Sequence, residues 1–142
     1  MTVAAILHDK GSDVIQVRSD DTVLFAVQLL AEKRIGCVPV VDHGKVVGIF
    51  SERDLVYRLG AEGAAILDAP VSTVMTSPAI TITPDTPVLQ GLSMMTRRRM
   101  RHLPVVVDGG LVGLVSIGDL VKFRIDRIEA EAEAMRVYIQ TA

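Results

Sequence analysis

A short polar pattern, Ser-x-x-Asp, occurs twice and contains the residue types of this chain that best suit ligand binding. Ser51 and Asp54 form the first copy, and Ser116 and Asp119 repeat it 65 positions later. A carboxylate can accept both hydroxyl groups of a ribose cis-diol, and charge-assisted bonds of this kind are strong. A serine at a helix N-terminus can bind ribose or phosphate, because free N–H groups gather there. The same spacing predicts a helix capping box, so a purely structural role stays open.

Cationic side chains are unequally distributed between the two copies. Arg53 lies inside the first pattern, whereas Gly118 takes its place in the second. The arginine run 97–99, with Arg101 and His102 after it, leads into the second copy's first hairpin strand. We expect at least one of these arginines to contact phosphate, although a solvated helix face is the alternative. His102 is either a site residue or a structural histidine.

The sequence around these patterns is itself repeated. Residues 34–56 recur as residues 99–121 without a gap, so that Pro39 matches Pro104 and Gly48 matches Gly113. A fixed period indicates one supersecondary unit used twice, and so short a unit cannot bury its apolar face alone. We therefore expect the two units to pack together, with a ligand-binding cleft at the junction.

Each unit is predicted to have the order β-α-β-β-α, which gives an α/β (α+β) fold. A short extended segment leads into an amphipathic helix that begins near Val23 in the first copy and near Val88 in the second. Two β-branched runs follow, joined by turns containing Asp and Gly, which indicates a hairpin. The extended segments are residues 14–17 and 80–82, and the hairpin strands are residues 38–41, 46–50, 103–107 and 111–115. The units are predicted to span residues 1–68 and 69–142.

The last helix is predicted to run from Ser116 to about Gln140. Residues 124–136 contain neither Gly nor Pro and are rich in Ala, Glu and Arg, which favour helix. The far end of this helix overshoots its own unit, so we expect a second subunit to cover its apolar stripe.

Length and composition limit the class of protein. The 142 residues, 49% of them hydrophobic, suit one compact module with a large core. No apolar run approaches the roughly 18 residues of a membrane span, and no signal peptide is recognisable. The net charge of −2 argues against nucleic acid as a partner. Because Cys37 is the single cysteine and cannot form an intrachain disulfide, we expect a cytoplasmic location.

Three stretches of the sequence carry a family resemblance. Pro-Val-Val followed by Gly-x-x-Ser-x-x-Asp occurs twice, and Val74-Met75-Thr76-Ser77-Pro78 precedes the second copy. The chain resembles, over essentially its whole length, the cystathionine β-synthase (CBS) domain pair, and most closely small stand-alone bacterial pairs. The resemblance implies a pseudo-twofold pair with a central cleft and two sites for adenosine-containing ligands. It also implies a homodimer that forms a flat disc of four units.

The resemblance further implies that the sites are crossed, the Asp of one unit facing the adenine pocket of the other. Site one would combine Ser51, Arg53, Asp54, Ile80, Arg101, His102 and Leu103. Site two would combine Ser116, Asp119, Ile15, Gly36, Cys37 and Val38. Because the arginines and the histidine belong to site one, we expect phosphate-bearing ligands to prefer it. Site two is expected to be weaker, empty or filled by an uncharged nucleoside portion.

The predicted function is that of a regulatory sensor that binds AMP, ADP, ATP or NAD(H) and signals to a partner protein through dimer geometry. The alternative is a ligand-free dimerisation or docking module that regulates a partner by contact. An enzyme is not expected, because the sequence shows no nucleophile–base pair, no metal-ligand cluster and no phosphate-binding loop motif. Accordingly, we expect no metal and no catalytic cofactor. Parallel and antiparallel discs are equally compatible with the sequence.

Overall fold

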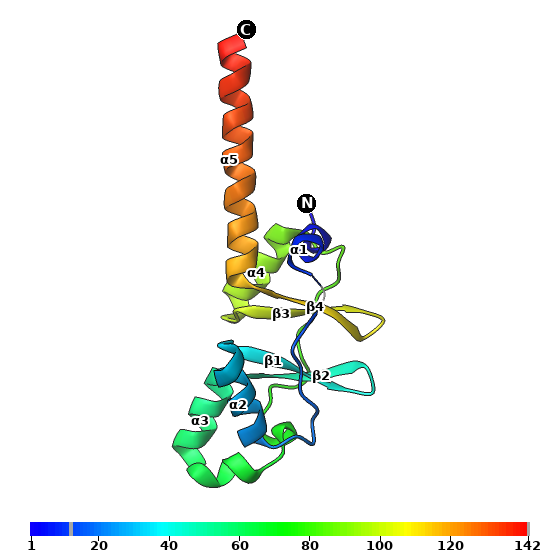
Figure 1. Cartoon of the computed structure of the whole chain (residues 1–142), viewed down its shortest axis with the longest axis vertical. Helices are drawn as coiled ribbons and strands as arrows, with labels where there is room; N and C mark the ends of the chain where they lie inside the picture. Colours follow the sequence, from blue (N-terminus) through cyan, green and yellow to red (C-terminus); the bar gives the residue numbers. More distant parts are fainter. Residues whose placement is uncertain (12, 142) are drawn as a thin grey trace.

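The computed structural model describes residues 1–11 and 13–141, which form two similar halves, each built on a β-hairpin (Figure 1). The two hairpins join edge to edge in a four-stranded sheet of order β1-β2-β4-β3. The strands are β1 (Cys37–Asp42), β2 (Lys45–Ser51), β3 (His102–Val107) and β4 (Gly110–Ser116). The helices are α1 (Val3–Lys10), α2 (Val23–Lys33), α3 (Glu52–Glu62), α4 (Val88–Arg98) and α5 (Ile117–Thr141), with 3-10 turns η1 (Ala64–Asp68) and η2 (Val71–Thr73).

The predicted order of elements is confirmed from the first helix of each unit onward. The extended segments before those helices are shorter than expected and form isolated parallel bridges, Val17 with Val40 and Ile82 with Val105. Helix α2 begins where predicted, because the hydroxyl of Thr22 accepts a hydrogen bond from the Phe25 N–H at 3.1 Å. A side-chain cap of this kind satisfies an N–H that the first helical turn would otherwise leave unpaired.

Both hairpins turn through two residues in the left-handed region. These are His43 (φ 50°) with Gly44 (φ 77°), and Asp108 (φ 53°) with Gly109 (φ 79°). Two-residue hairpin loops in which both central residues have positive φ match the right-handed twist of the strands. The second turn uses the predicted Asp and Gly. In the first turn, the residue with positive φ before the glycine is His43, whereas we expected an Asp, as in the second turn.

Two apolar cores lie one in each half, and each includes a segment from the other end of the repeat. Val3 and Ile6 of helix α1 are buried in the core of the second half, with Leu103 and Leu120. Reciprocally, Val71 and Val74 are buried in the core of the first half. The predicted boundary between residues 68 and 69 stays a prediction, but packing crosses it in both directions.

Two matched glycines allow these exchanged segments to approach the sheet. A Cβ at Gly48 would lie 2.6 Å from Met75 Sδ, and a Cβ at Gly113 would lie 2.5 Å from Leu7 Cδ2. Real Cβ atoms do not approach so closely, so only glycine permits this packing. The space beside each glycine is therefore filled by the chain itself.

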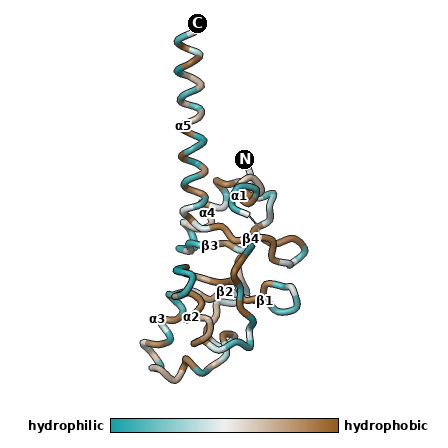
Figure 2. The backbone as a smooth tube through the Cα atoms, viewed as in Figure 1, coloured by the Kyte–Doolittle hydropathy of each residue, from teal (hydrophilic) through white to brown (hydrophobic). Residues whose placement is uncertain are grey.

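Helix α5 is a single helix of 25 residues, close to the length predicted. It begins against its own half, where Leu120 is fully buried, and then leaves the rest of the molecule (Figure 1). Apolar segments recur along its projecting part (Figure 2). Among the residues that the structure describes, no helix is both long enough and apolar enough to cross a membrane.

Candidate functional site

Both Ser-x-x-Asp patterns form the predicted caps. The Ser51 N–H donates to Asp54 Oδ2 at 2.9 Å, and the Asp54 N–H donates to Ser51 Oγ at 3.3 Å. The corresponding distances for Ser116 and Asp119 are 2.8 and 3.1 Å. Reciprocal bonds of this kind fix each helix N-terminus and its carboxylate in one position. The structural role is therefore established for both pairs, and a ligand role would be additional.

A cavity of about 400 Å³ lies between the two halves, at the place where site two was predicted. Its lining from the first half includes Ile15, Arg34, Gly36 and Cys37, and its lining from the second half includes His102, Leu114 and Ser116. Cavities that hold small molecules typically measure about 300–1,000 Å³. The structure thus brings Ile15, Gly36, Cys37 and Ser116 together as the crossed arrangement requires.

Lys10, at the end of helix α1, adds a cation to this cavity that the sequence analysis did not anticipate. Its Nζ donates to Asp119 Oδ2 at 2.6 Å and to the carbonyl oxygen of Leu114 at 2.9 Å. Burial raises the pKa of Asp119, but hydrogen bonds from Lys10 and Ser116 outweigh it and hold the pKa below its ordinary value. Asp119 is therefore an ionised carboxylate at neutral pH, next to the cavity.

His102 lines this cavity, although it was assigned to site one. A Cβ placed on Gly36 would lie 3.7 Å from His102 Cε1, so the imidazole reaches across to the first half. Burial, with a further contribution from the charge of Lys10, lowers the pKa of His102. The imidazole is accordingly neutral at neutral pH and can both donate and accept a hydrogen bond.

Cys37 lies in the cavity wall but is nearly inaccessible, with 2% of its surface exposed. Burial raises its pKa to about 12. Because the thiolate is the reactive form, this thiol is unreactive at neutral pH. Cys37 therefore behaves as the small buried hydrophobe that the sequence analysis expected.

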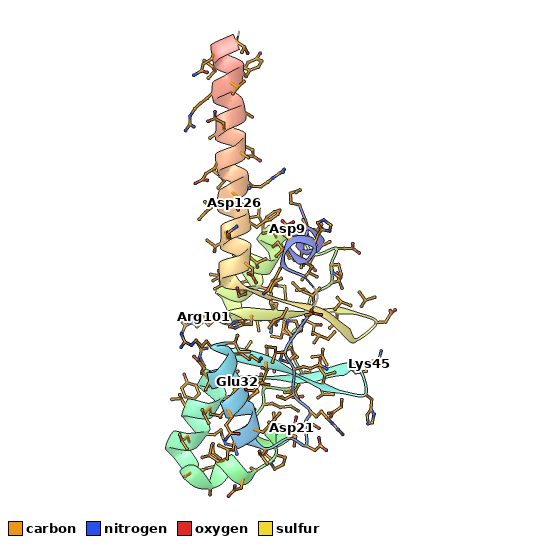
Figure 3. The ribbon with its side chains drawn as sticks, viewed as in Figure 1. Asp9, Asp21, Glu32, Lys45, Arg101 and Asp126 are labelled. Atoms are coloured by element: carbon orange, nitrogen blue, oxygen red, sulfur yellow. The ribbon has the colours of Figure 1, made fainter. Side chains whose placement is uncertain are left out.

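The side chains of Arg53 and Asp54, from site one, make contacts within the chain. The Thr76 hydroxyl donates to Asp54 Oδ1 at 3.0 Å, and Arg53 donates to the Arg99 carbonyl oxygen at 3.1 Å. Arg101 is exposed and lies between the two halves in Figure 3. Its carbonyl oxygen accepts a hydrogen bond from the Ile117 N–H at 2.8 Å. Ile80 is partly buried and packs against the core of the second half.

Two predicted site residues lie in the cores. Val38 is fully buried in the first half and Leu103 is fully buried in the second. Alternate residues of a strand point to opposite faces, and these two point inward. Their side chains are therefore not available to a ligand, and any contribution would come from their backbone.

The cavity also contains residues that sequence reasoning missed, chiefly Lys10, Asp13 and Arg34. Lys10 and Asp13 lie outside the repeated stretches 34–56 and 99–121, so the register of the repeat could not assign them to a site. The sequence does contain a signal for Arg34, because it matches Arg99 in the repeat. Both arginines end their helices in the left-handed region, with φ of 54° and 53°. The premise that site two lacks cations is wrong.

Comparison with known proteins establishes the class of protein that this fold and cavity represent. The CBS domain family matches residues 5–61 and residues 71–126. The chain belongs to the CBS domain family and contains two such domains in tandem, as the resemblance indicated.

Relatives share the fold over most of the chain. The CBS domain-containing protein CBSX3 of Arabidopsis thaliana, named as mitochondrial, is 33% identical over 148 residues, covering 98% of this chain and 72% of that protein. The crystal structure of a CBS-domain containing protein from Agrobacterium tumefaciens has a TM-score of 0.82 and 41% identity, covering 87% of this chain and 99% of that one. The cytoplasmic location stays a prediction.

One solved relative contains adenosine derivatives. The CBS domain pair of protein MJ0100, in complex with 5′-methylthioadenosine and S-adenosyl-L-methionine, has a TM-score of 0.78 and 27% identity. The match covers 89% of this chain and 98% of that chain.

Proposed function

We propose that this chain is a regulatory module that binds an adenosine-containing ligand in the cavity between its two CBS domains. The observation that carries the proposal is the cavity of about 400 Å³, whose wall comes from both halves. A ligand there contacts both domains at once. It can therefore favour one relative arrangement of the domains to the extent that it binds that arrangement more tightly.

The ribose of such a ligand would bind Asp119. This carboxylate is ionised and accepts a hydrogen bond from the Ser116 N–H at 2.8 Å. It also contacts Lys10, which lines the cavity, so it lies next to the cavity. Two hydroxyl groups of a ribose can replace the ammonium group as donors to it. The contact between Lys10 and Asp119 is partly exposed, with 42% and 27% of the side chains accessible, so a ligand can displace it at small cost.

Two cationic side chains, Lys10 and Arg34, line the same cavity, together with the neutral His102 and with Asp13. A ligand with phosphate groups, such as AMP, ADP, ATP or NAD(H), would therefore find a cation close to the ribose site. Charge-assisted bonds from lysine or arginine to phosphate are roughly twice as strong as neutral ones. We accordingly propose that site two also accepts phosphate-bearing ligands, which the sequence analysis expected to prefer site one.

Regulation is proposed in preference to catalysis, since the cavity offers binding groups and the thiol in its wall is unreactive. CBS pairs are regulatory modules, and the chain matches that family over both halves. The module is further proposed to act as a homodimer that changes the activity of a partner protein by its geometry.

Thermal unfolding of nucleotide-free protein tests the ligand class. AMP, ADP, ATP, NAD⁺, NADH and S-adenosylmethionine are each added, with GMP as the control for the base. A ligand at 100 times its dissociation constant adds about 2.7 kcal/mol of stability, which raises the midpoint of a chain of this size by roughly 5–10 °C. A rise with adenosine ligands and none with GMP is expected. Unchanged midpoints with every ligand at millimolar concentration would overturn the proposal.

A matched pair of variants locates the site. Asp119→Asn removes the carboxylate beside the cavity, and Asp54→Asn removes its equivalent, which forms the same cap. Calorimetric titration is expected to show an affinity loss of about 10- to 100-fold for Asp119→Asn, because hydrogen bonds to charged groups contribute about 1.5–3 kcal/mol. A loss confined to Asp54→Asn would place the ligand in site one instead.

A further inference from the structure

Helix α5 carries a heptad pattern of apolar residues. Its members are Val121, Ile125, Ile128, Ala132, Met135 and Ile139, separated by alternating steps of four and three residues. Such steps place all six on one side of a helix, at the a and d positions of a coiled coil. We refer to these six residues as the α5 seam.

Within residues 1–11 and 13–141, the α5 seam is left largely exposed by the fold. The exposed fraction of the side chains rises from 40% at Val121 to 49% at Ile128 and 66% at Ile139. A different side of the helix faces the domain, since Leu120 is fully buried and Phe123 packs against the same core. Figure 1 shows that the helix then projects away from both halves. The seam is therefore a continuous apolar surface facing water.

We propose that the α5 seam packs against the same seam of a second copy, as a parallel two-stranded coiled coil in register. Two strands match the proposed homodimer. Ile125 and Ile139 at a favour two strands, whereas Ile128 at d is also β-branched, which favours higher orders. A free helix with so short a seam would be marginal in water. Here α5 begins at Ile117 and its first turn is held in a folded domain by Leu120, which favours a helix at the base of the seam before it pairs.

The charges beside the seam favour the parallel orientation. In a parallel coiled coil, each g residue lies next to the e residue of the following heptad on the partner helix. Arg124 then lies beside Glu129 of the second copy, and Glu131 lies beside Arg136 of the second copy. Both pairs join opposite charges, and the twofold symmetry forms each pair twice.

In the antiparallel orientation, the charges beside the seam are unfavourable. There, e residues face e residues and g residues face g residues across the seam. When the seam is aligned so that Ile128 packs on Ala132, Glu129 faces Glu129, Glu131 faces Glu131, and Lys122 faces Arg136. Every charged pair is then of like sign, which is unfavourable. The flanking charges thus favour the parallel orientation of the helix pair over the antiparallel one.

Ion pairs within α5 do not compete strongly with this arrangement. Arg136 lies 2.9 Å from Glu133, and Arg127 lies 3.8 Å from Glu131. All four side chains are largely exposed, between 45% and 68%, and exposed pairs of this kind contribute little. Arg136 and Glu131 can therefore turn to the partner helix at small cost.

Cysteine cross-linking tests the orientation without any ligand. In the parallel register, residue 128 packs against residue 128, so Ile128→Cys is expected to form a disulfide-linked dimer under mild oxidation. Glu133→Cys, at an exposed b position five residues along the helix, is the matched control and is expected to remain monomeric on a non-reducing gel. The wild-type chain controls for Cys37, which is buried.

Two outcomes would overturn the proposal. The first is a monomeric wild-type chain in sedimentation at tens of micromolar. The second is the antiparallel pattern, in which Ile128→Cys alone does not cross-link, but a mixture of Ile128→Cys and Ala132→Cys proteins does. The inference rests on the proposed homodimer and not on ligand binding. Failure of the nucleotide titrations with successful cross-linking would therefore reject only the ligand proposal.

Charge reversal gives an independent measurement. Glu129→Arg places like charges beside Arg124 of the second copy, and is expected to weaken dimerisation about tenfold in sedimentation equilibrium. The double variant Arg124→Glu with Glu129→Arg restores opposite charges in the parallel register only, and is expected to recover the wild-type dimer. A double variant as weak as the single one would contradict the parallel arrangement.

Discussion

Lys10 Nζ lies 2.6 Å from Asp119 Oδ2, although 109 residues separate the two in the sequence. The contact ties the end of helix α1 to the first turn of helix α5, at the cavity between the halves. The carboxylate that the repeat marks as a ribose ligand is thus already paired with a cation of the chain. A ligand that binds Asp119 Oδ2 therefore competes with this ammonium group.

Replacement of Lys10 is expected to separate the nucleoside from the phosphate contribution to binding. In Lys10→Met, adenosine no longer competes with an ion pair, and exposed pairs contribute about 0.2–1 kcal/mol, so its affinity should rise up to about fivefold. AMP loses a charge-assisted contact, so its affinity should fall about tenfold. Calorimetric titration with both ligands measures the difference.

Lys122→Met is the control for this measurement, because Lys122 also forms an ion pair, with Asp126 at 3.2 Å, but lies on α5 outside the cavity lining. It is expected to leave both affinities unchanged. Weaker binding of adenosine and AMP alike in Lys10→Met would show that Lys10 supports the cavity instead of competing for Asp119.

His102 is expected to make the folded state less stable in mild acid. Burial, followed by the charge of Lys10, lowers its pKa below the ordinary value of 6.5, while Asp119 opposes the shift. The unfolded chain therefore takes up a proton at a higher pH than the folded chain does. The contribution of His102 to the free energy of unfolding is therefore complete above pH 6.5. It decreases as the pH falls toward the pKa that His102 has in the folded state.

Urea unfolding between pH 8 and pH 5 measures this dependence in the wild type and in His102→Gln. The wild-type free energy of unfolding should fall more steeply below about pH 6.5 than that of the variant, because glutamine does not titrate in this range. Parallel curves for the two proteins would show that the pKa of His102 does not change on folding.

Gly113→Ala is expected to displace helix α1. The added Cβ would lie 2.5 Å from Leu7 Cδ2, and overpacking of this kind costs about 1–3 kcal/mol of stability. Adding Leu7→Ala makes room, so the double variant should lose less than the sum of the two single changes. Thermal or urea unfolding measures all three proteins.

The matched control for this prediction is Gly60→Ala in helix α3. A Cβ at Gly60 meets nothing within 4 Å, and alanine in a helix interior is favoured over glycine by about 0.5–1 kcal/mol. Gly60→Ala should therefore stabilise the chain. Equal effects at the two glycines would mean that contact with Leu7 does not decide the cost at Gly113.

Much of the fold could be predicted because its signals are local. The paired turns His43-Gly44 and Asp108-Gly109, the helix after Ser51 and the helix after Ser116 each depend on residues a few positions apart. Turn geometry, strand alternation and capping act over such distances, so their sequence patterns are sufficient. The repeat then required two units, and the residue match implied their family.

Tertiary packing alone decided the composition of the cavity. The family resemblance implied that Ser116 and Asp119 face the other half, but helix α1 brought Lys10 to them by packing Val3 and Ile6 in the distant core. No periodic pattern in the sequence predicts where helix α1 packs. Its position depends on which apolar surface remains uncovered after both halves fold. The caps and turns were thus determined by the sequence itself, whereas the charges that surround a ligand were decided when distant segments met.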